Sequence, residues 1–245
     1  MKLRTFVQET FRHDYTCPLC GREKFDETPF CKRCETLFAE PRLFVCPKCG
    51  RKTAIEGMCL DCKSNLPTFT RGFTPFIYRD QIAAMINRMK NSNPRPALYL
   101  GEQMAEYFAE KHFQKSQSQE ELLIVPVPMT KTKIIERGYN QSLRLAESVC
   151  ARLQSLGYTA RVEDELLQKR KETAPQKQMT YYERLENVSG AYHVHKRKEC
   201  RGKVIILIDD VMTTGATSSE CAARLFGAGA KEVYFLVAAA VIERR

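Results

Sequence analysis

The stretch VIILIDDVMTTGATS, from Val204 to Ser218, decides the fold of this chain. It begins with a continuous run of valine, isoleucine and leucine, which is typical of a strand buried on both faces of a parallel sheet. Asp209 and Asp210 follow at the carboxyl end of that strand, where open α/β sheets bind their ligands. The stretch therefore predicts an α/β fold with a ligand site at this strand end.

The residues after the acidic pair, Met212 to Thr217, include three threonines, a glycine and an alanine. Backbone N–H groups of such a loop can converge on an anion at the positive end of a helix, which we expect to begin near Ser218. The two carboxylates suit vicinal hydroxyls instead, so the pair and the loop together favour a sugar phosphate such as ribose 5-phosphate. The alternative is that the aspartates only cap the helix and the threonines only form a turn.

This order of apolar strand, acidic pair and Thr-Thr-Gly-x-Thr loop resembles the binding loop for phosphoribosyl pyrophosphate (PRPP) in the phosphoribosyltransferase family. The resemblance implies that Asp209 and Asp210 hold the ribose hydroxyls. It also implies that the 5-phosphate is bound by Thr213, Thr214, Gly215, Ala216 and Thr217. Mg²⁺ is expected with PRPP, because this hard cation normally shares phosphate and diol oxygens with few protein ligands.

Eight of the eleven cysteines lie before residue 63 in four C-x-x-C pairs: Cys17 and Cys20, Cys31 and Cys34, Cys46 and Cys49, Cys59 and Cys62. The first two pairs return as the last two after 28 or 29 residues. Two pairs can bind one tetrahedral zinc ion and leave no open position for catalysis. The repeat favours two sequential structural zinc sites. An interleaved pairing is the alternative, and a redox C-x-x-C would need a βαβ pattern that is missing here.

Composition divides the chain near residue 66. Residues 1–66 hold few large apolar side chains, so we expect a tandem zinc-ribbon module whose folding energy comes from metal, on the order of 10 kcal/mol per site. In residues 67–245, apolar strand patterns alternate with amphipathic helix patterns, which predicts a parallel sheet flanked by helices. The fold class is therefore α/β, a phosphoribosyltransferase-type, Rossmann-like domain preceded by a small zinc-ribbon module with four-cysteine sites.

Charge and hydropathy limit the classes of protein that fit. The formal net charge is +10, and residues 131–203 contain sixteen Lys or Arg against nine Asp or Glu. Such a basic stripe, with Tyr139, Tyr158, Tyr181, Tyr182 and Tyr192 interleaved, suits single-stranded nucleic acid, although a solvated face explains it equally well. No uncharged apolar run reaches about 18 residues and no signal peptide is recognisable, so we expect a soluble, cytoplasmic protein without a membrane span.

Several motifs together resemble the ComF family of competence proteins: the paired cysteines, Met89-Lys90, Val125–Pro128, Glu136–Gln141, Thr173–Gln176, Glu183–Val188 and the Asp209-Asp210 loop. One departure is Asn91-Ser92-Asn93, where the family usually has an aromatic residue and a glycine after the lysine. The resemblance implies that Pro126–Lys131, and so Lys131, lies at the pyrophosphate. It also implies that residues 137–142 and 173–184 form loops that close on the ligand.

Arg137 is the best candidate to bind the diphosphate, because a guanidinium can bind two oxygens at once. The alternative is a surface arginine, and for Lys90 and Arg184 neither interpretation is favoured. Asp209, Asp210 and Arg137 are therefore the candidate catalytic residues.

The ComF resemblance implies a PRPP-binding protein that handles incoming single-stranded DNA in natural transformation, with a DNA-uptake helicase or other competence proteins as candidate partners. The alternative is an active phosphoribosyltransferase of nucleotide metabolism or salvage. The sequence contains a donor site but no recognisable acceptor site. It therefore supports binding more strongly than catalysis.

Overall fold

The computed structural model describes residues 17, 19–23, 30–35, 43–91, 93–112, 120–171 and 181–242. The chain divides into two compact units, Met1–Pro41 and Arg42–Arg245. The smaller unit contains α2 (Lys32–Glu35) and the first four paired cysteines. The second cysteine group lies within the larger unit, and a domain boundary at residue 66 stays a prediction.

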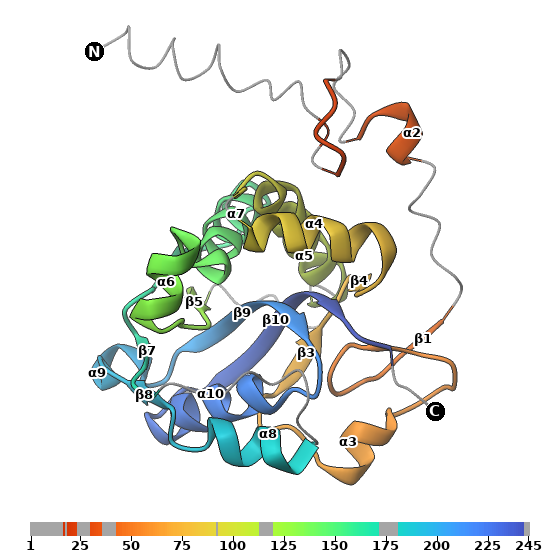
Figure 1. Ribbon diagram of the computed structural model, residues 1–245. Coiled ribbons are helices and arrows are strands. Elements are labelled where there is room, and N and C mark those ends of the chain that lie inside the picture. The colour runs from red at the N-terminus through yellow and green to blue at the C-terminus, as the bar shows by residue number, and fades with distance from the viewer. Residues whose placement is uncertain are drawn as a thin grey trace, which may run out of the picture. The chain divides into compact units, whose positions relative to one another are not determined.

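A parallel sheet of six strands forms the centre of the larger unit (Figure 1). Its strand order is β3-β10-β9-β5-β6, and β4 pairs with β10 beyond the end of β3. Every pairing within this sheet is parallel, which confirms the fold class expected from the sequence. The strands are β3 (Arg71–Phe73), β4 (Phe76–Ile77), β5 (Leu122–Pro126), β6 (Ala160–Val162), β9 (Val204–Met212) and β10 (Glu232–Ala240).

Helices cover both faces of the sheet (Figure 1). One face carries α4 (Asp80–Lys90), α5 (Pro96–His112) and α7 (Gln141–Ser155), with α5 and α7 packed against each other and on the strands. The other face carries α10 (Ala216–Gly227), which contacts α8 (Tyr181–Val188) and β8 (Tyr192–Val194). Strand β8 pairs antiparallel with β7 (Leu167–Lys169). Two short helices, α6 (Lys131–Arg137) and α9 (Arg197–Cys200), complete this part of the fold.

Strand β9 continues further than the sequence indicated. The apolar run was expected to end at Ile208, but β9 reaches Met212, because β10 pairs with it as far as Met212 and Ala240. Strand β5 stops pairing with β9 at Pro126 and Ile208, and the last contact is the Val127 N–H, which donates to the Ile208 carbonyl at 2.9 Å. The acidic pair therefore lies on a part of β9 that β5 has already left.

The second cysteine group is packed against β3. It belongs to a segment with β1 (Phe44–Val45), β2 (Lys52–Thr53) and α3 (Leu60–Ser64). The backbone N–H of Gly72 donates to the Lys48 carbonyl at 2.7 Å, and a Cβ at Gly72 would lie 2.4 Å from the Cys49 carbonyl oxygen. Two backbones approach so closely here that only glycine fits, which holds this segment firmly on the sheet.

Candidate functional site

The acidic pair is held by side chains from two helices. The Ser142 hydroxyl, in the first turn of α7, donates to Asp209 Oδ1 at 3.0 Å. The ammonium group of Lys90, the last residue of α4, lies 3.1 Å from Asp210 Oδ2. Asp210 is only 5% exposed, so the charge of Lys90 offsets much of the cost of burying its carboxylate.

Asp209 titrates far from its ordinary range. Burial, with the charge of Asp210 as a second cause, raises the pKa of Asp209 from 3.8 to about 7. Hydrogen bonds from the Asp210 backbone N–H and from Ser142 partly oppose this rise, because they favour the ionised form. A carboxyl that is half protonated near neutral pH marks a position where a cation or polar ligand would be stabilising.

The loop after β9 forms the N-terminal end of α10. Gly215 has φ of 80° and is the N-cap residue, so the helix begins at Ala216, slightly earlier than the predicted start near Ser218. The Ala216 N–H contacts the Thr214 hydroxyl at 3.4 Å. A small pocket is lined by Asp209, Phe235 and residues 211–218. The N–H groups in the first turn of a helix lack intrahelical partners, so this pocket has the chemistry of an anion site.

A buried tyrosine lies beside this loop. The sequence had suggested that it could stack on bases. Tyr192 on β8 is 5% exposed, and its hydroxyl lies near Thr217. Burial raises the pKa of Tyr192, with Cys221 and Asp209 nearby. The ring is therefore not available to stack on a nucleic acid. The side chains of Tyr181 and Tyr182 lie outside the described residues.

The two cations expected at a diphosphate lie at opposite ends of α6. Lys131 is exposed at its start and Arg137 is half-buried at its end, and neither forms an ion pair with a described residue. Between α6 and α7, the Tyr139 hydroxyl donates to the Met89 carbonyl and the Asn140 side chain caps α7 by accepting from the Ser142 N–H. The Thr173–Gln176 motif and the side chain of Arg184 lie outside the described residues.

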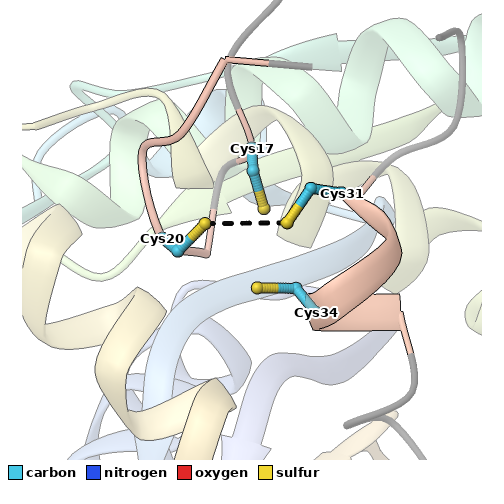
Figure 2. A group of neighbouring side chains, drawn as sticks. All are labelled: Cys17, Cys20, Cys31 and Cys34. Carbon is cyan, nitrogen blue, oxygen red and sulfur yellow. Dashed lines mark hydrogen bonds between the residues drawn. The ribbon is translucent and has the colours of Figure 1, made fainter. Parts of the chain in front are cut away.

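The paired cysteines form two separate groups of four thiols. One consists of Cys17, Cys20, Cys31 and Cys34 (Figure 2), and the other of Cys46, Cys49, Cys59 and Cys62. Within each group the sulfur atoms lie within 4.8 Å of one another. The pairing is therefore sequential and not interleaved.

Sulfur spacing in both groups fits zinc. The Cys20–Cys31 and Cys49–Cys59 sulfur distances are each 3.7 Å. Tetrahedral zinc with bonds of about 2.3 Å places its sulfur ligands about 3.8 Å apart. Four thiolates fill the coordination shell, so each group would act as a structural site.

A cavity of about 480 Å³ lies at the opposite end of the sheet. Its lining includes the first residues of four strands, Arg71, Leu122, Val204 and Glu232. Ligands of open α/β sheets bind at the carboxyl ends of the strands, so this cavity is not the candidate site.

Two competence proteins are similar in sequence to this chain. No protein-family model matches the sequence. ComFC, a competence protein of Bacillus subtilis, is 27% identical over 198 residues, which are 76% of this chain and 73% of that protein. ComFC of Streptococcus pneumoniae is 28% identical over 239 residues, 89% of this chain and 96% of that protein. The resemblance to ComF proteins is confirmed.

More distant similarities extend the comparison. YhgH of Escherichia coli K12, described as a DNA utilization protein, is 26% identical over 196 residues, 78% of this chain and 83% of that protein. Among solved structures, a glutamine PRPP amidotransferase of Bacillus subtilis, complexed with ADP and GMP, is similar with a TM-score of 0.32 and 19% identity. That similarity covers 58% of this chain and 26% of the amidotransferase chain.

Three of the motifs that resemble ComF proteins meet the Asp209-Asp210 pair at one place in the structure. Lys90, Pro126 and the start of α7 all lie beside the carboxyl end of β9, next to the acidic pair. These residues come from well-separated parts of the sequence, and the parallel sheet brings them together. In the part of the chain that the structure describes, no helix is long and apolar enough to cross a membrane.

Proposed function

We propose that this chain binds PRPP together with Mg²⁺ at the carboxyl end of β9 and handles incoming single-stranded DNA in natural transformation. One observation carries the proposal. The acidic pair, supported by Lys90 and Ser142, directly precedes a loop whose N–H groups open the helix α10. Two carboxylates that suit a diol and a helix start that suits an anion thus lie side by side, and this supports a ribose 5-phosphate as the ligand.

Each half of the ligand has its own group of residues in this proposal. The carboxylates of Asp209 and Asp210 would hold the ribose hydroxyls, and residues Thr213–Thr217 would bind the 5-phosphate. Lys131 and Arg137 would meet the diphosphate. Helix α6, which carries both, buries none of its side chains, and this supports a closing movement of α6 over the ligand.

Magnesium fits the same carboxylates. Mg²⁺ normally keeps several waters and binds to one or two carboxylates together with phosphate oxygens of the substrate. An ion near Asp209 would also favour the ionised form of that carboxyl, whose pKa burial raises to about 7. Ligand binding and ionisation of Asp209 would then strengthen each other.

The cellular role rests on the relatives and on charge. The similar proteins are named as competence proteins and DNA utilization proteins. Residues 131–203 carry a surplus of Lys and Arg that would attract a DNA backbone. In this proposal the protein acts in the cytoplasm beside the DNA-uptake helicase or other competence proteins.

Catalysis of phosphoribosyl transfer is the second candidate function. It is favoured by Asp209, whose raised pKa would suit proton transfer near neutral pH. A transferase also needs a nucleophile held beside the ribose, and no described residue is assigned to that task. We therefore place binding before catalysis.

The test is calorimetric titration of PRPP with Mg²⁺ into the wild type and into Asp209→Asn/Asp210→Asn. The control is Asp164→Asn/Glu165→Gln, which makes the same charge change in an exposed acidic pair before β7. We expect the site variant to lose PRPP binding and the control to retain it. Equal binding by all three proteins would contradict the proposal.

Two further measurements separate the roles. Single-stranded DNA binding is measured across salt concentrations, because phosphate contacts weaken as salt rises. Pyrophosphate release is measured with a panel of bases and ammonia. Acceptor-dependent release would establish the transferase, and absence of DNA binding at low salt would refute the DNA-handling role.

A further inference from the structure

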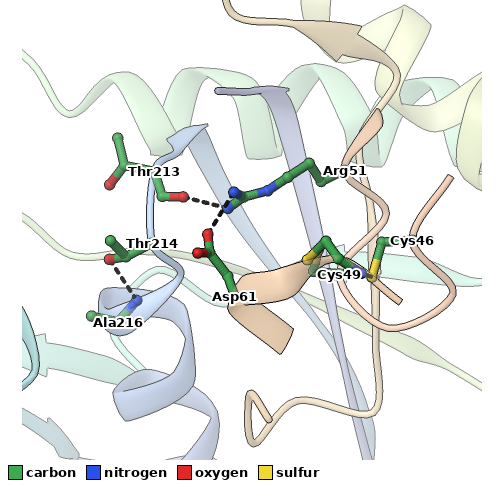
Figure 3. A network of polar contacts seen from close by, with 8 residues as sticks. Cys46, Cys49, Arg51, Asp61, Thr213, Thr214 and Ala216 are labelled. Carbon is green, nitrogen blue, oxygen red and sulfur yellow. Dashed lines mark hydrogen bonds and ion pairs between the residues drawn. The ribbon is translucent and has the colours of Figure 1, made fainter. Parts of the chain in front are cut away.

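Arg51 joins the second cysteine group to the proposed phosphate loop. The residue follows the Cys46–Cys49 pair by two positions, and its side chain is only 4% exposed. One arm of the guanidinium lies 2.6 Å from Asp61 Oδ2 (Figure 3). The other arm donates to the backbone carbonyl of Thr213, the residue at which the loop leaves β9.

Both residues of this ion pair are positioned by the cysteines. The Cys46–Cys49 pair lies in a turn that ends at Arg51. The Cys46 N–H closes this turn by donating to the Arg51 carbonyl at 2.9 Å. Asp61 lies in α3, between Cys59 and Cys62. A metal ion bound by the four thiolates would therefore fix both ends of the pair. A buried guanidinium also requires its partners, since an unpaired buried charge is strongly destabilising.

A second contact ties the same segment to α10. The backbone N–H of Thr68 donates to the Ser219 hydroxyl at 3.0 Å, and the Thr68 hydroxyl lies 3.1 Å from the same atom. The N–H of Ser219 donates in turn to the Gly215 carbonyl at 2.9 Å. The phosphate loop is thus held on one side by Arg51 and on the other by Thr68.

The internal repeat shows what is special about the second cysteine group. Arg22 follows the Cys17–Cys20 pair as Arg51 follows its own, yet Arg22 is exposed. At the position of Asp61, the first group has Arg33. Two arginines cannot form the ion pair, so the first group lacks the pair that fixes Arg51 in the second.

We propose that Arg51 is a positioning residue that couples metal binding at the second cysteine group to anion binding at Thr213–Thr217. Metal binding by the four thiolates fixes the position of Arg51, and Arg51 donates a hydrogen bond to the Thr213 carbonyl. The loop therefore keeps the conformation that binds a phosphate. Coupling of two binding sites is reciprocal, so an anion in the loop strengthens metal binding at this group by the same factor. The proposal rests on the proposed function for the identity of that anion, PRPP.

The first test compares Arg51→Lys with Arg22→Lys, the matched change in the other half of the repeat. Zinc content, amide hydrogen exchange of residues 213–218 and PRPP affinity are measured on the full chain. For Arg51→Lys we expect zinc to be retained, loop exchange to be about tenfold faster and PRPP affinity to be about tenfold weaker, because one charged hydrogen bond is lost. Arg22→Lys should match the wild type. Unchanged exchange in a zinc-loaded Arg51→Lys protein would overturn the proposal.

If Arg51→Lys does not fold, Asp61→Asn is the second test variant, because it keeps the guanidinium of Arg51 and removes only the negative charge that pairs with it. Its loop should also exchange faster than that of the wild type, and an unchanged rate refutes the coupling. If wild-type protein does not bind PRPP, the proposed function fails while hydrogen exchange still decides the coupling.

Reciprocity gives an independent test on unmodified protein. Zinc affinity is measured by equilibrium competition with a coloured chelator, with and without PRPP and Mg²⁺. We expect one of the two zinc ions to bind several-fold more tightly when PRPP is bound. Equal zinc affinities for PRPP-bound and free protein would overturn the coupling.

Discussion

Lys90 and Asp210 form an ion pair that joins the C-terminal end of α4 to the end of β9, with 3.1 Å between Nζ and Oδ2. Asp210 Oδ2 has no hydrogen-bond partner among the described residues, so the charge of Lys90 is its main stabilising contact. The pair fixes one wall of the proposed ligand site. It also explains why a lysine stands at the end of an otherwise amphipathic helix.

We predict that Lys90→Met lowers the free energy of unfolding by about 2 kcal/mol, because it leaves a buried carboxylate uncompensated. Urea unfolding measures the change. The control is Arg144→Met, which removes an exposed ion pair with Glu147 and should cost less than about 1 kcal/mol. Adding Asp210→Asn to Lys90→Met should restore most of the loss. Equal effects of the two single variants would contradict the assignment.

Ser142 is expected to tune the ionisation of Asp209. Its hydroxyl donates to Asp209 Oδ1, so Ser142→Ala should raise the pKa of Asp209 further and cost about 1 kcal/mol of stability. The control is Ser148→Ala on the same helix, whose hydroxyl donates to the Leu98 carbonyl at 2.8 Å. Carbon-detected NMR of the Asp209 carboxyl measures its pKa in each of the two variants. Only Ser142→Ala should move that pKa, and a shift of equal size in Ser148→Ala would refute the role.

Stability should depend on pH through Asp209. Burial raises the folded-state pKa of Asp209 to about 7 from 3.8, so the folded state binds more protons than the unfolded state between these values. The free energy of unfolding therefore falls as pH rises through this window, and the destabilisation is complete above the folded pKa. Between about pH 6 and about pH 8, wild type should lose about 1 kcal/mol more than Asp209→Asn.

Urea unfolding of zinc-loaded protein at both pH values measures this difference. The control Asp164→Asn changes an exposed aspartate and should keep the wild-type pH dependence. A pH dependence in Asp209→Asn as steep as that of the wild type would show that Asp209 is not the titrating group.

Local sequence pattern was sufficient for the sheet and for the cysteine groups. The apolar run at Val204–Ile208 predicted a strand buried on both faces, and all five residues are buried. The C-x-x-C repeat predicted sequential sites, and each group of four thiols is formed by consecutive pairs. Both features depend on residues close together in the sequence, which is why pattern alone could reveal them.

Contacts between distant residues could not be predicted in the same way. No sequence pattern around Ser142 predicts its hydrogen bond to Asp209, and none around Arg51 predicts its hydrogen bond to the Thr213 carbonyl. The end of β9 at Met212 likewise depended on its pairing with β10, which the apolar run alone does not reveal. Tertiary packing decided these features, and the two arginines at Arg22 and Arg51 show that the same local motif can have different roles.

Removing one ligand from each cysteine group should affect the two units differently. Cys20→Ser and Cys49→Ser are each expected to lower zinc content from two ions to about one per chain, measured by atomic absorption. The cysteines of the second group are part of the apolar core of the larger unit. Cys49→Ser should therefore lower its free energy of unfolding by about 3 kcal/mol or more, because metal binding contributes directly to folding. Cys20→Ser should leave that value unchanged, and an equal loss in both variants would contradict the separation of the two groups.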